Sequence, residues 1–160
     1  MVKFTSKQIQ KKGSMEMLVE SEDIEKMCSF YVSDFHLEMI LVPYLNKKID
    51  NKEDIKIITE KNLQDSIKIL ISRMNMPEEK KQKILDLGWD KNENLLMKKS
   101  NFIIIGSEAY IKEKNKEIKQ LNMPNLTIVD CYDFEEVKEN INDIKSNYNN
   151  NLNTLGSNKF

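Results

Sequence analysis

The chain alternates between short, continuous apolar runs and longer segments in which apolar residues recur every three or four positions. The short runs lie near 28–32, 55–59, 102–106 and 127–131, and they are rich in residues that favour β-strands. Continuous apolar runs are typical of strands that are buried on both faces. Because a helical pattern follows each run, the sequence predicts an α/β fold in three layers, with a mainly parallel sheet between helices on both faces.

The predicted helix over 35–49 has a clear start and one anomaly. Its apolar residues follow the helical period, and Ser33 or Asp34 can cap its first turn. Pro43 lies in its interior, where a proline removes a backbone hydrogen bond and costs about 3 kcal/mol. A kink there would either shape a cavity or fit the helix to the twist of the sheet, and the sequence leaves both open.

The length of 160 residues suits a single domain. Residues 1–26 are polar and only loosely periodic, which predicts an N-terminal helix or arm. The α/β domain is expected over 27–148. The last segment, 149–160, is rich in asparagine and poor in apolar residues, so it is predicted to be a disordered tail.

Composition narrows the class of protein. The formal net charge is -1, and Arg73 is the only arginine. We therefore expect no broad basic surface for nucleic acid or membrane, and no site built on arginine side chains. The N-terminus lacks an apolar signal segment, and no apolar run is long enough to span a membrane. The sequence predicts a cytoplasmic protein.

Residues with catalytic or metal-binding chemistry are few. Cys28 and Cys131 stand far apart and His36 is the only histidine, so a zinc site is not expected. Both cysteines lie in strand-like runs, which favours buried, reduced thiols. A catalytic His36 would need an orienting group and an oxyanion site, and the local spacing supplies neither. We predict no metal, cofactor or catalytic residue, and we favour a protein that is not an enzyme while leaving that question open.

Phosphate-binding motifs are missing from the sequence. It contains neither GxxxxGK[ST] nor GxGxxG, and only Gly106 and Ser107 stand where a phosphate-binding turn would lie. Such a turn needs several close backbone amides, and Glu108 adds a like charge beside it. A simple tight turn is therefore favoured. A degenerate RecA-like nucleotide-binding protein, or an enzyme built on that site, remains the alternative function.

Two segments carry a resemblance to a known family: FYVSDFHLEMILVPYLNKKIDNKE (30–53) and CYDF (131–134). The matching positions in the first segment are Phe30, Tyr31, Leu41, Val42, Pro43, Tyr44, Ile49 and Glu53. This pattern resembles the MEDS domain, the sensory domain of methanogens, methylotrophs and the DcmR regulator. The chain departs from the family at Lys26, which replaces a histidine, and at Lys48 and Lys52, which replace glycines. The resemblance implies a RecA- or KaiC-like core without a nucleotide-binding loop, in a family that senses small, hydrocarbon-like molecules.

In parallel α/β sheets, ligands bind beyond the carboxyl ends of the strands and near helix N-termini. The residues predicted to bind a ligand there are Tyr31, Ser33, Asp34, Ser107, Tyr132 and Asp133. The tyrosines would supply an apolar wall with polar tips, unless they are core residues. The acidic side chains favour a neutral or weakly polar ligand over a phosphate compound.

Together these patterns predict a non-catalytic sensory or regulatory module that binds a small molecule or a partner protein. A module of this kind acts through contact, so a regulatory partner or a homodimer is expected. Nucleic-acid binding through the charged helix over 108–120 is ranked last, because its lysines and glutamates nearly balance.

Overall fold

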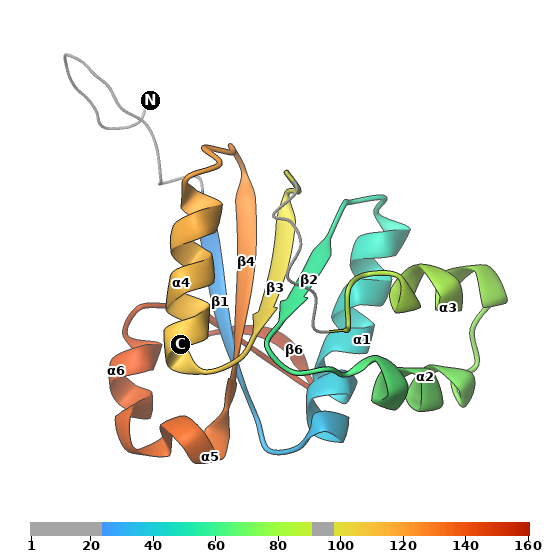
Figure 1. Cartoon of the computed structure of the whole chain (residues 1–160), viewed down its shortest axis with the longest axis horizontal. Helices are drawn as coiled ribbons and strands as arrows, with labels where there is room; N and C mark the ends of the chain where they lie inside the picture. The colour runs from blue at the N-terminus through green and yellow to red at the C-terminus, as the bar shows by residue number, and fades with distance from the viewer. Residues whose placement is uncertain (1–23, 91–97) are drawn as a thin grey trace.

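Figure 1 shows the computed structural model, which describes residues 24–90 and 98–160. Its centre is a six-stranded sheet in the order β2-β3-β4-β1-β5-β6. The strands are β1 (Ile24–Tyr31), β2 (Lys56–Thr59), β3 (Asn101–Ile105), β4 (Leu126–Asp133), β5 (Asn150–Asn153) and β6 (Gly156–Lys159). Neighbouring strands are parallel except for β5 and β6, which are antiparallel. The first four are the predicted strands, so the predicted α/β sheet is confirmed.

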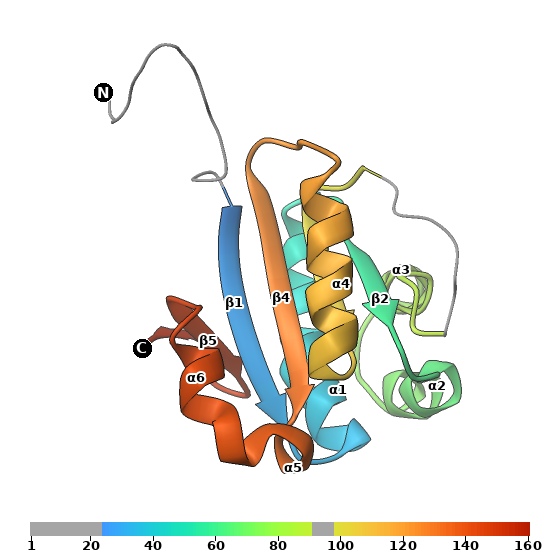
Figure 2. The ribbon, with the colours of Figure 1, turned by 60° about the vertical axis from the view of Figure 1, so that its left-hand side comes forward.

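Helices cover both faces of the sheet, which gives the predicted three layers (Figures 1 and 2). The helices are α1 (Asp34–Asp50), α2 (Gln64–Ser72), α3 (Glu78–Leu85), α4 (Glu108–Lys119), α5 (Phe134–Val137) and α6 (Ile141–Lys145). The first three pack on one face, and the last three pack on the other (Figure 2). A 3-10 turn over Lys138–Asn140 joins α5 to α6.

The four predicted strands, β1 to β4, are largely buried on both faces, as their continuous apolar runs predict. Side chains of β3 alternate between two separate cores: Ile103 packs on the α1 side, whereas Phe102 and Ile104 pack on the α4 side. Cys28 and Cys131 are both free and buried, as expected. Burial raises the pKa of the Cys28 thiol to about 12, so this side chain stays protonated as a small apolar residue.

The prediction of a disordered tail over 149–160 is wrong. β5 and β6 form a hairpin there, and β5 pairs in parallel with β1 through Met27↔Asn150 and Cys28↔Asn151. The Ser29 hydroxyl donates a hydrogen bond to the Leu152 carbonyl at 2.8 Å, and Leu152 is only 3% exposed. The free edge of β1 supplies backbone partners, which compensate for the few apolar residues in the segment itself.

The turn of the hairpin is formed by two residues that favour turns, an asparagine and a glycine. The Asn153 side-chain oxygen accepts a hydrogen bond from the Leu155 amide at 2.8 Å, which closes the turn. Gly156 follows with φ of 107°, in the left-handed region that glycine adopts at little steric cost. An asparagine before the turn and a glycine after it therefore direct the chain back along β5.

The predicted boundary at residue 26 also moves. Ile24, Glu25 and Lys26 belong to β1, because they pair with the first residues of β4, Leu126 to Ile128. The remainder of the predicted N-terminal helix or arm, residues 1–23, lies outside the described residues.

Candidate functional site

The six residues predicted to bind a ligand do lie at the carboxyl ends of three neighbouring strands, β3, β4 and β1. Tyr31 and Asp133 end their strands and are paired in register. Ser107 lies just beyond β3. The sheet therefore gathers these positions at one edge, and their side chains decide whether a site exists there.

The two tyrosines of that set point to opposite faces of the sheet. Tyr31 pairs with Asp133 and Tyr132 pairs with Phe30, so the pleat separates the two rings. Tyr31 is 2% exposed in the core on the α1 side, and Tyr132 is 5% exposed in the core on the α4 side. They are packing residues of two different cores and do not form a common wall.

The polar members of the set have structural partners. Three of them cap helices by accepting a hydrogen bond from a backbone amide of the first turn: Ser33 from His36, Ser107 from Tyr110 and Asp133 from Glu135. Asp34 forms an ion pair with Lys61 at 2.6 Å. The His36 Nδ1 atom accepts from the Val32 amide at 3.0 Å, which is a structural role for the only histidine.

A carboxylate already occupies the position at which a phosphate would approach α4. The Ser107 amide donates to the Glu60 Oε1 atom at 2.7 Å. A Cβ atom at Gly106 would lie 2.6 Å from the Tyr110 ring and 2.9 Å from that same Glu60 oxygen. Gly106 is therefore needed for the close approach of Tyr110 and Glu60, and the Glu60 charge weighs against the alternative of a degenerate nucleotide site.

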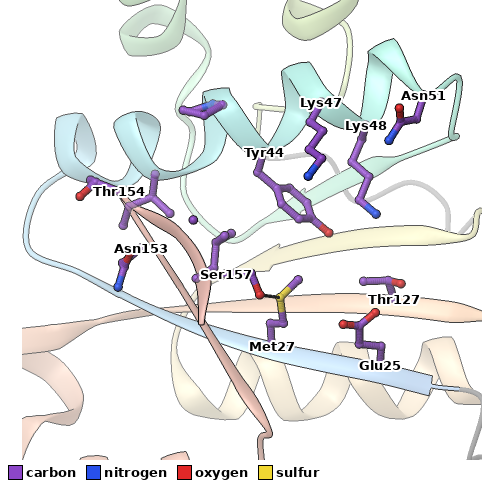
Figure 3. A pocket seen from close by; sticks show the side chains of 14 residues that line it. Glu25, Met27, Tyr44, Lys47, Lys48, Asn51, Thr127, Asn153, Thr154 and Ser157 are labelled. Atoms are coloured by element: carbon purple, nitrogen blue, oxygen red, sulfur yellow. Dashed lines mark hydrogen bonds between the residues drawn. The ribbon is translucent and has the colours of Figure 1, made fainter. Parts of the chain in front are cut away.

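A cavity of ≈ 360 Å³ lies between α1 and the β5–β6 hairpin, and Figure 3 shows it from close by. We call it the hairpin cavity. Its walls come from the second half of α1, from the hairpin, and from Glu25 and Thr127 near the amino ends of β1 and β4. It therefore lies toward the opposite end of the strands from the predicted site.

One side of the hairpin cavity is apolar. Met27, Ile40 and Leu152 are each at most 4% exposed and line it together with Pro43. The Ser157 hydroxyl donates a hydrogen bond to the Met27 sulfur at 3.3 Å, which joins β6 to the cavity wall. These side chains can hold an apolar group away from water.

The other side of the cavity is polar. Figure 3 shows Tyr44, Lys47 and Lys48 extending from α1 toward Thr127 and Glu25 on the strands. Lys48 pairs with Glu53 at 3.2 Å and lies 5.4 Å from the centre of the Tyr44 ring.

The Tyr44 hydroxyl is buried, and it has no hydrogen-bond partner within the described part of the chain. Burial, with a smaller contribution from the Glu25 and Glu53 carboxylates, raises the pKa of this hydroxyl. Tyr44 is therefore a neutral hydrogen-bond donor that lines the cavity and has no acceptor among residues 24–90 and 98–160. A buried donor without an acceptor is costly, so a bound group that accepts its hydrogen bond would be favoured.

The groups that line the cavity can hold an amphipathic molecule through apolar contacts and hydrogen bonds. The polar side of the cavity offers the Tyr44 hydroxyl, the ammonium groups of Lys47 and Lys48, the Glu25 carboxylate and the Thr127 hydroxyl. Across 24–90 and 98–160, no three His, Cys, Asp or Glu side chains are grouped so that they could hold a metal ion.

The sequence pointed to part of this cavity. Pro43 was singled out because a proline inside a helix could shape a cavity, and it does line the wall. Tyr44 was expected on the apolar face of the helix over 35–49 and as part of the family resemblance, but not as a ligand-binding residue. The hairpin side could not be expected from a segment that was predicted to be disordered.

The chain matches no family model, no curated protein and no solved structure. The resemblance to the MEDS family therefore remains a prediction, as does the RecA-like character of the core. Among the described helices, none combines the length and the apolar character needed to cross a membrane.

Proposed function

We propose that the protein is a non-catalytic sensory or regulatory module that binds a small amphipathic molecule in the hairpin cavity. The observation that carries the proposal is the buried Tyr44 hydroxyl, which lines a formed cavity without an acceptor of its own in the described segments. Small-molecule sites combine an apolar lining with a few polar groups that fix orientation, and this cavity has both. The resemblance of residues 30–53 to a sensory family supports the same role.

The lining sets the chemistry of the ligand. An apolar body would contact Met27, Ile40 and Leu152, and a polar end would accept the hydrogen bond from Tyr44. Lys47 and Lys48 border that end, where Lys48 is already paired with Glu53 and Glu25 lines the same side. Lys47 has no ion-pair partner in the described segments, so it can attract an acceptor that carries negative charge. A short-chain carboxylate has both features.

Ligand binding would be transmitted through the hairpin. A molecule in the cavity touches α1, β1 and the hairpin together, so it would hold β5 and β6 against α1. β6 is the outer strand of the sheet, and three of its four residues are exposed. A ligand that stabilises this edge changes the surface that a regulatory partner or a second copy would contact.

The test uses the full chain with octanoate, octanol and glucose as probes, followed by thermal unfolding and calorimetry. We expect octanoate to bind at one molecule per chain and to raise the melting temperature, octanol to bind more weakly, and glucose to have no effect. Tyr44→Phe should weaken octanoate binding about tenfold, because one buried hydrogen bond to a charged group is lost.

Tyr31→Phe is the matched control, since Tyr31 is a buried tyrosine outside the hairpin cavity and belongs to the site predicted from sequence. It should leave octanoate binding unchanged. A larger loss for Tyr31→Phe than for Tyr44→Phe would overturn the proposal and move the site to the carboxyl ends of the strands. Failure of every amphipathic probe to bind would also overturn it.

A further inference from the structure

A second cavity, of ≈ 610 Å³, lies on the opposite face of the sheet between α4 and α6. Figure 2 shows these two helices on the same side of the sheet, with the ribbons of β1 and β4 visible between them. We call this cavity the lysine cleft, after Lys26, Lys112, Lys116 and Lys119, which line it. It shares no lining residue with the hairpin cavity.

The floor of the lysine cleft is a buried polar network around Asp130, which is 0% exposed. One carboxylate oxygen accepts from the Tyr148 hydroxyl at 2.5 Å, and the other accepts from the Asn115 amide nitrogen at 3.0 Å. Lys26 lies 3.5 Å from Asp130. The Tyr132 and Tyr148 hydroxyls are 2.6 Å apart. Because Tyr148 donates its proton to Asp130, Tyr132 donates to Tyr148.

One atom of this floor lacks a partner. Asn115 is 6% exposed, and its side-chain oxygen is buried without a hydrogen-bond donor anywhere in the described segments. The amide nitrogen donates both to the Ile111 carbonyl at 2.9 Å and to Asp130. Because both of these partners are acceptors, the amide cannot be reversed, and within the described segments its buried oxygen is left without a donor.

The rim of the cleft supplies positive charge. Lys112, Lys116 and Lys119 follow one face of α4 at helical spacing, and all three are exposed. None of the three forms an ion pair within the described part of the chain, whereas Lys114 on the adjacent face pairs with Glu117. Glu108 and Asp143 also line the cleft, and Glu108 precedes Lys112 by one turn of α4. With Asp130 and Lys26 included, four lysines face three carboxylates, so the excess of positive charge lies toward Lys116 and Lys119.

We infer that the lysine cleft binds a small polyhydroxylated anion of the sugar phosphate class. The lysine rim would hold the phosphate through charge-assisted hydrogen bonds, while a hydroxyl of the sugar would donate to the Asn115 oxygen. Asp130 and its hydrogen-bond partners fill the floor, so the phosphate stays at the rim near the lysines of α4 and the uncharged hydroxyls approach the floor. The rings of Tyr132 and Tyr148 are at most 8% exposed, so no open aromatic face is offered for stacking a nucleotide base.

The inference is independent of the amphipathic ligand proposed above. Lys26 and Met27 are consecutive residues of β1, and the pleat directs one to the lysine cleft and the other to the hairpin cavity. Each site can therefore be altered without touching the other, and failure at one leaves the other standing.

The test titrates the isotope-labelled full chain with glucose 6-phosphate, glucose and inorganic phosphate, and follows backbone amide signals. We expect saturable binding of glucose 6-phosphate, with shifts in α4, α6 and the residues around Asp130. Glucose alone and phosphate alone should each bind at least about tenfold more weakly, because each makes only one of the two sets of contacts.

Two double variants, each with two lysines replaced by glutamine, test the role of the lysine row. The double variant Lys112→Gln, Lys116→Gln should weaken glucose 6-phosphate binding about tenfold or more. Because both side chains are exposed, the variant should keep the fold. The control is Lys68→Gln with Lys83→Gln, two exposed lysines of α2 and α3 on the other face, and it should leave binding unchanged. Equal loss in both pairs, equal affinity for phosphate alone, or no shift at the cleft would each overturn the inference.

Discussion

The hairpin cavity and the lysine cleft lie on opposite faces of β1 and β4. They differ in whether the central buried polar group of each has hydrogen-bond partners. In the lysine cleft, Asp130 has hydrogen-bond donors on both carboxylate oxygens. In the hairpin cavity, the Tyr44 hydroxyl is buried with no partner in the described segments. On the α4 side, the Asp130 network therefore contributes hydrogen bonds to the packing, although the Asn115 oxygen lacks a partner in the described segments. On the α1 side, the Tyr44 hydroxyl contributes none. The two faces should therefore respond differently to mutation.

The largest effect is expected at the centre of the network. Asp130→Ala leaves the Tyr148 hydroxyl, the Asn115 amide and the Lys26 charge without their shared acceptor. Breaking a buried charged network in this way costs about 4 kcal/mol of the free energy of unfolding. Urea unfolding measures it, with Asp143→Ala, an exposed carboxylate of the same cleft, as a control that should change little. A loss below about 1 kcal/mol for Asp130→Ala would show that the network does not stabilise the fold.

The next effect tests the hairpin. Leu152→Ala removes the buried side chain with which β5 packs against α1, and it should lower the free energy of unfolding by about 3 kcal/mol. Leu155→Ala makes the same chemical change in the turn of the same hairpin, where the side chain is 91% exposed, and should have almost no effect. Equal, small effects at both leucines would mean that the hairpin is not docked on β1.

A smaller contrast comes from two tyrosine hydroxyls. Tyr148→Phe removes hydrogen bonds to Asp130 and Tyr132 and should cost about 2 kcal/mol. Tyr44→Phe removes a buried hydroxyl that has no partner in the described segments, so the unliganded protein should be as stable as the wild type or slightly more stable. Thermal unfolding of the two variants measures the difference. A clear destabilisation by Tyr44→Phe would reveal a partner for its hydroxyl.

A pH dependence should come from Glu38, an acid of α1 that is 1% exposed and has one oxygen without a hydrogen-bond partner in the described segments. Burial raises the pKa of this carboxyl above its ordinary value of 4.5, so the folded protein retains the proton to higher pH than the unfolded chain does. The contribution of Glu38 to the free energy of unfolding therefore falls as pH rises from about 4.5 through the raised pKa.

Glu38→Gln removes that dependence while keeping the shape of the side chain. We expect the stability of the variant relative to the wild type to increase as pH rises, in urea unfolding between about pH 4 and about pH 8. Parallel curves for the two proteins over this range would contradict the expectation.

The smallest effect on stability is expected in the turns that follow α1 and α4, the long helices on the two faces of the sheet. Lys52 follows α1 and has φ of 59°, a left-handed conformation that costs a side-chain-bearing residue about 1–2 kcal/mol. Lys52→Gly should stabilise the protein by about 0.5–1 kcal/mol, after the greater entropy of glycine in the unfolded chain is subtracted. Asn122 follows α4 with φ of 51°, and asparagine tolerates this region better, so Asn122→Gly should gain less. A larger gain at Asn122 would contradict this argument.

Local signals in the sequence were sufficient for the sheet and for the starts of its helices. The runs around Ile57, Ile103 and Val129 become buried strands because a continuous apolar run has no polar face to turn toward water. Ser33, Ser107 and Asp133 become helix caps because each needs only an amide two or three residues further along the chain. These interactions lie within a few residues, so they do not depend on how distant strands pair.

The face of the sheet to which each tyrosine of the predicted site points is set by strand pairing between distant parts of the chain. Whether Tyr31 and Tyr132 share a face is decided by the register between β1 and β4, which pairs Tyr31 with Asp133. A shift of the register by one residue would have moved one of the two rings to the other face of the sheet. No local pattern sets this register, because the two strands are separated by most of the domain.

The sequence by itself determined the parallel α/β sheet, its two buried faces and its capped helices. Only the tertiary structure decided that the asparagine-rich segment forms β5 and β6, because the backbone partners of Asn150 and Leu152 are supplied by β1. The hairpin cavity exists for the same reason: its walls meet only once the last residues of the chain have paired with the first described strand. A cavity between segments far apart in sequence depends on how those segments pack against each other. Composition and periodicity describe single segments, so they do not predict such a cavity.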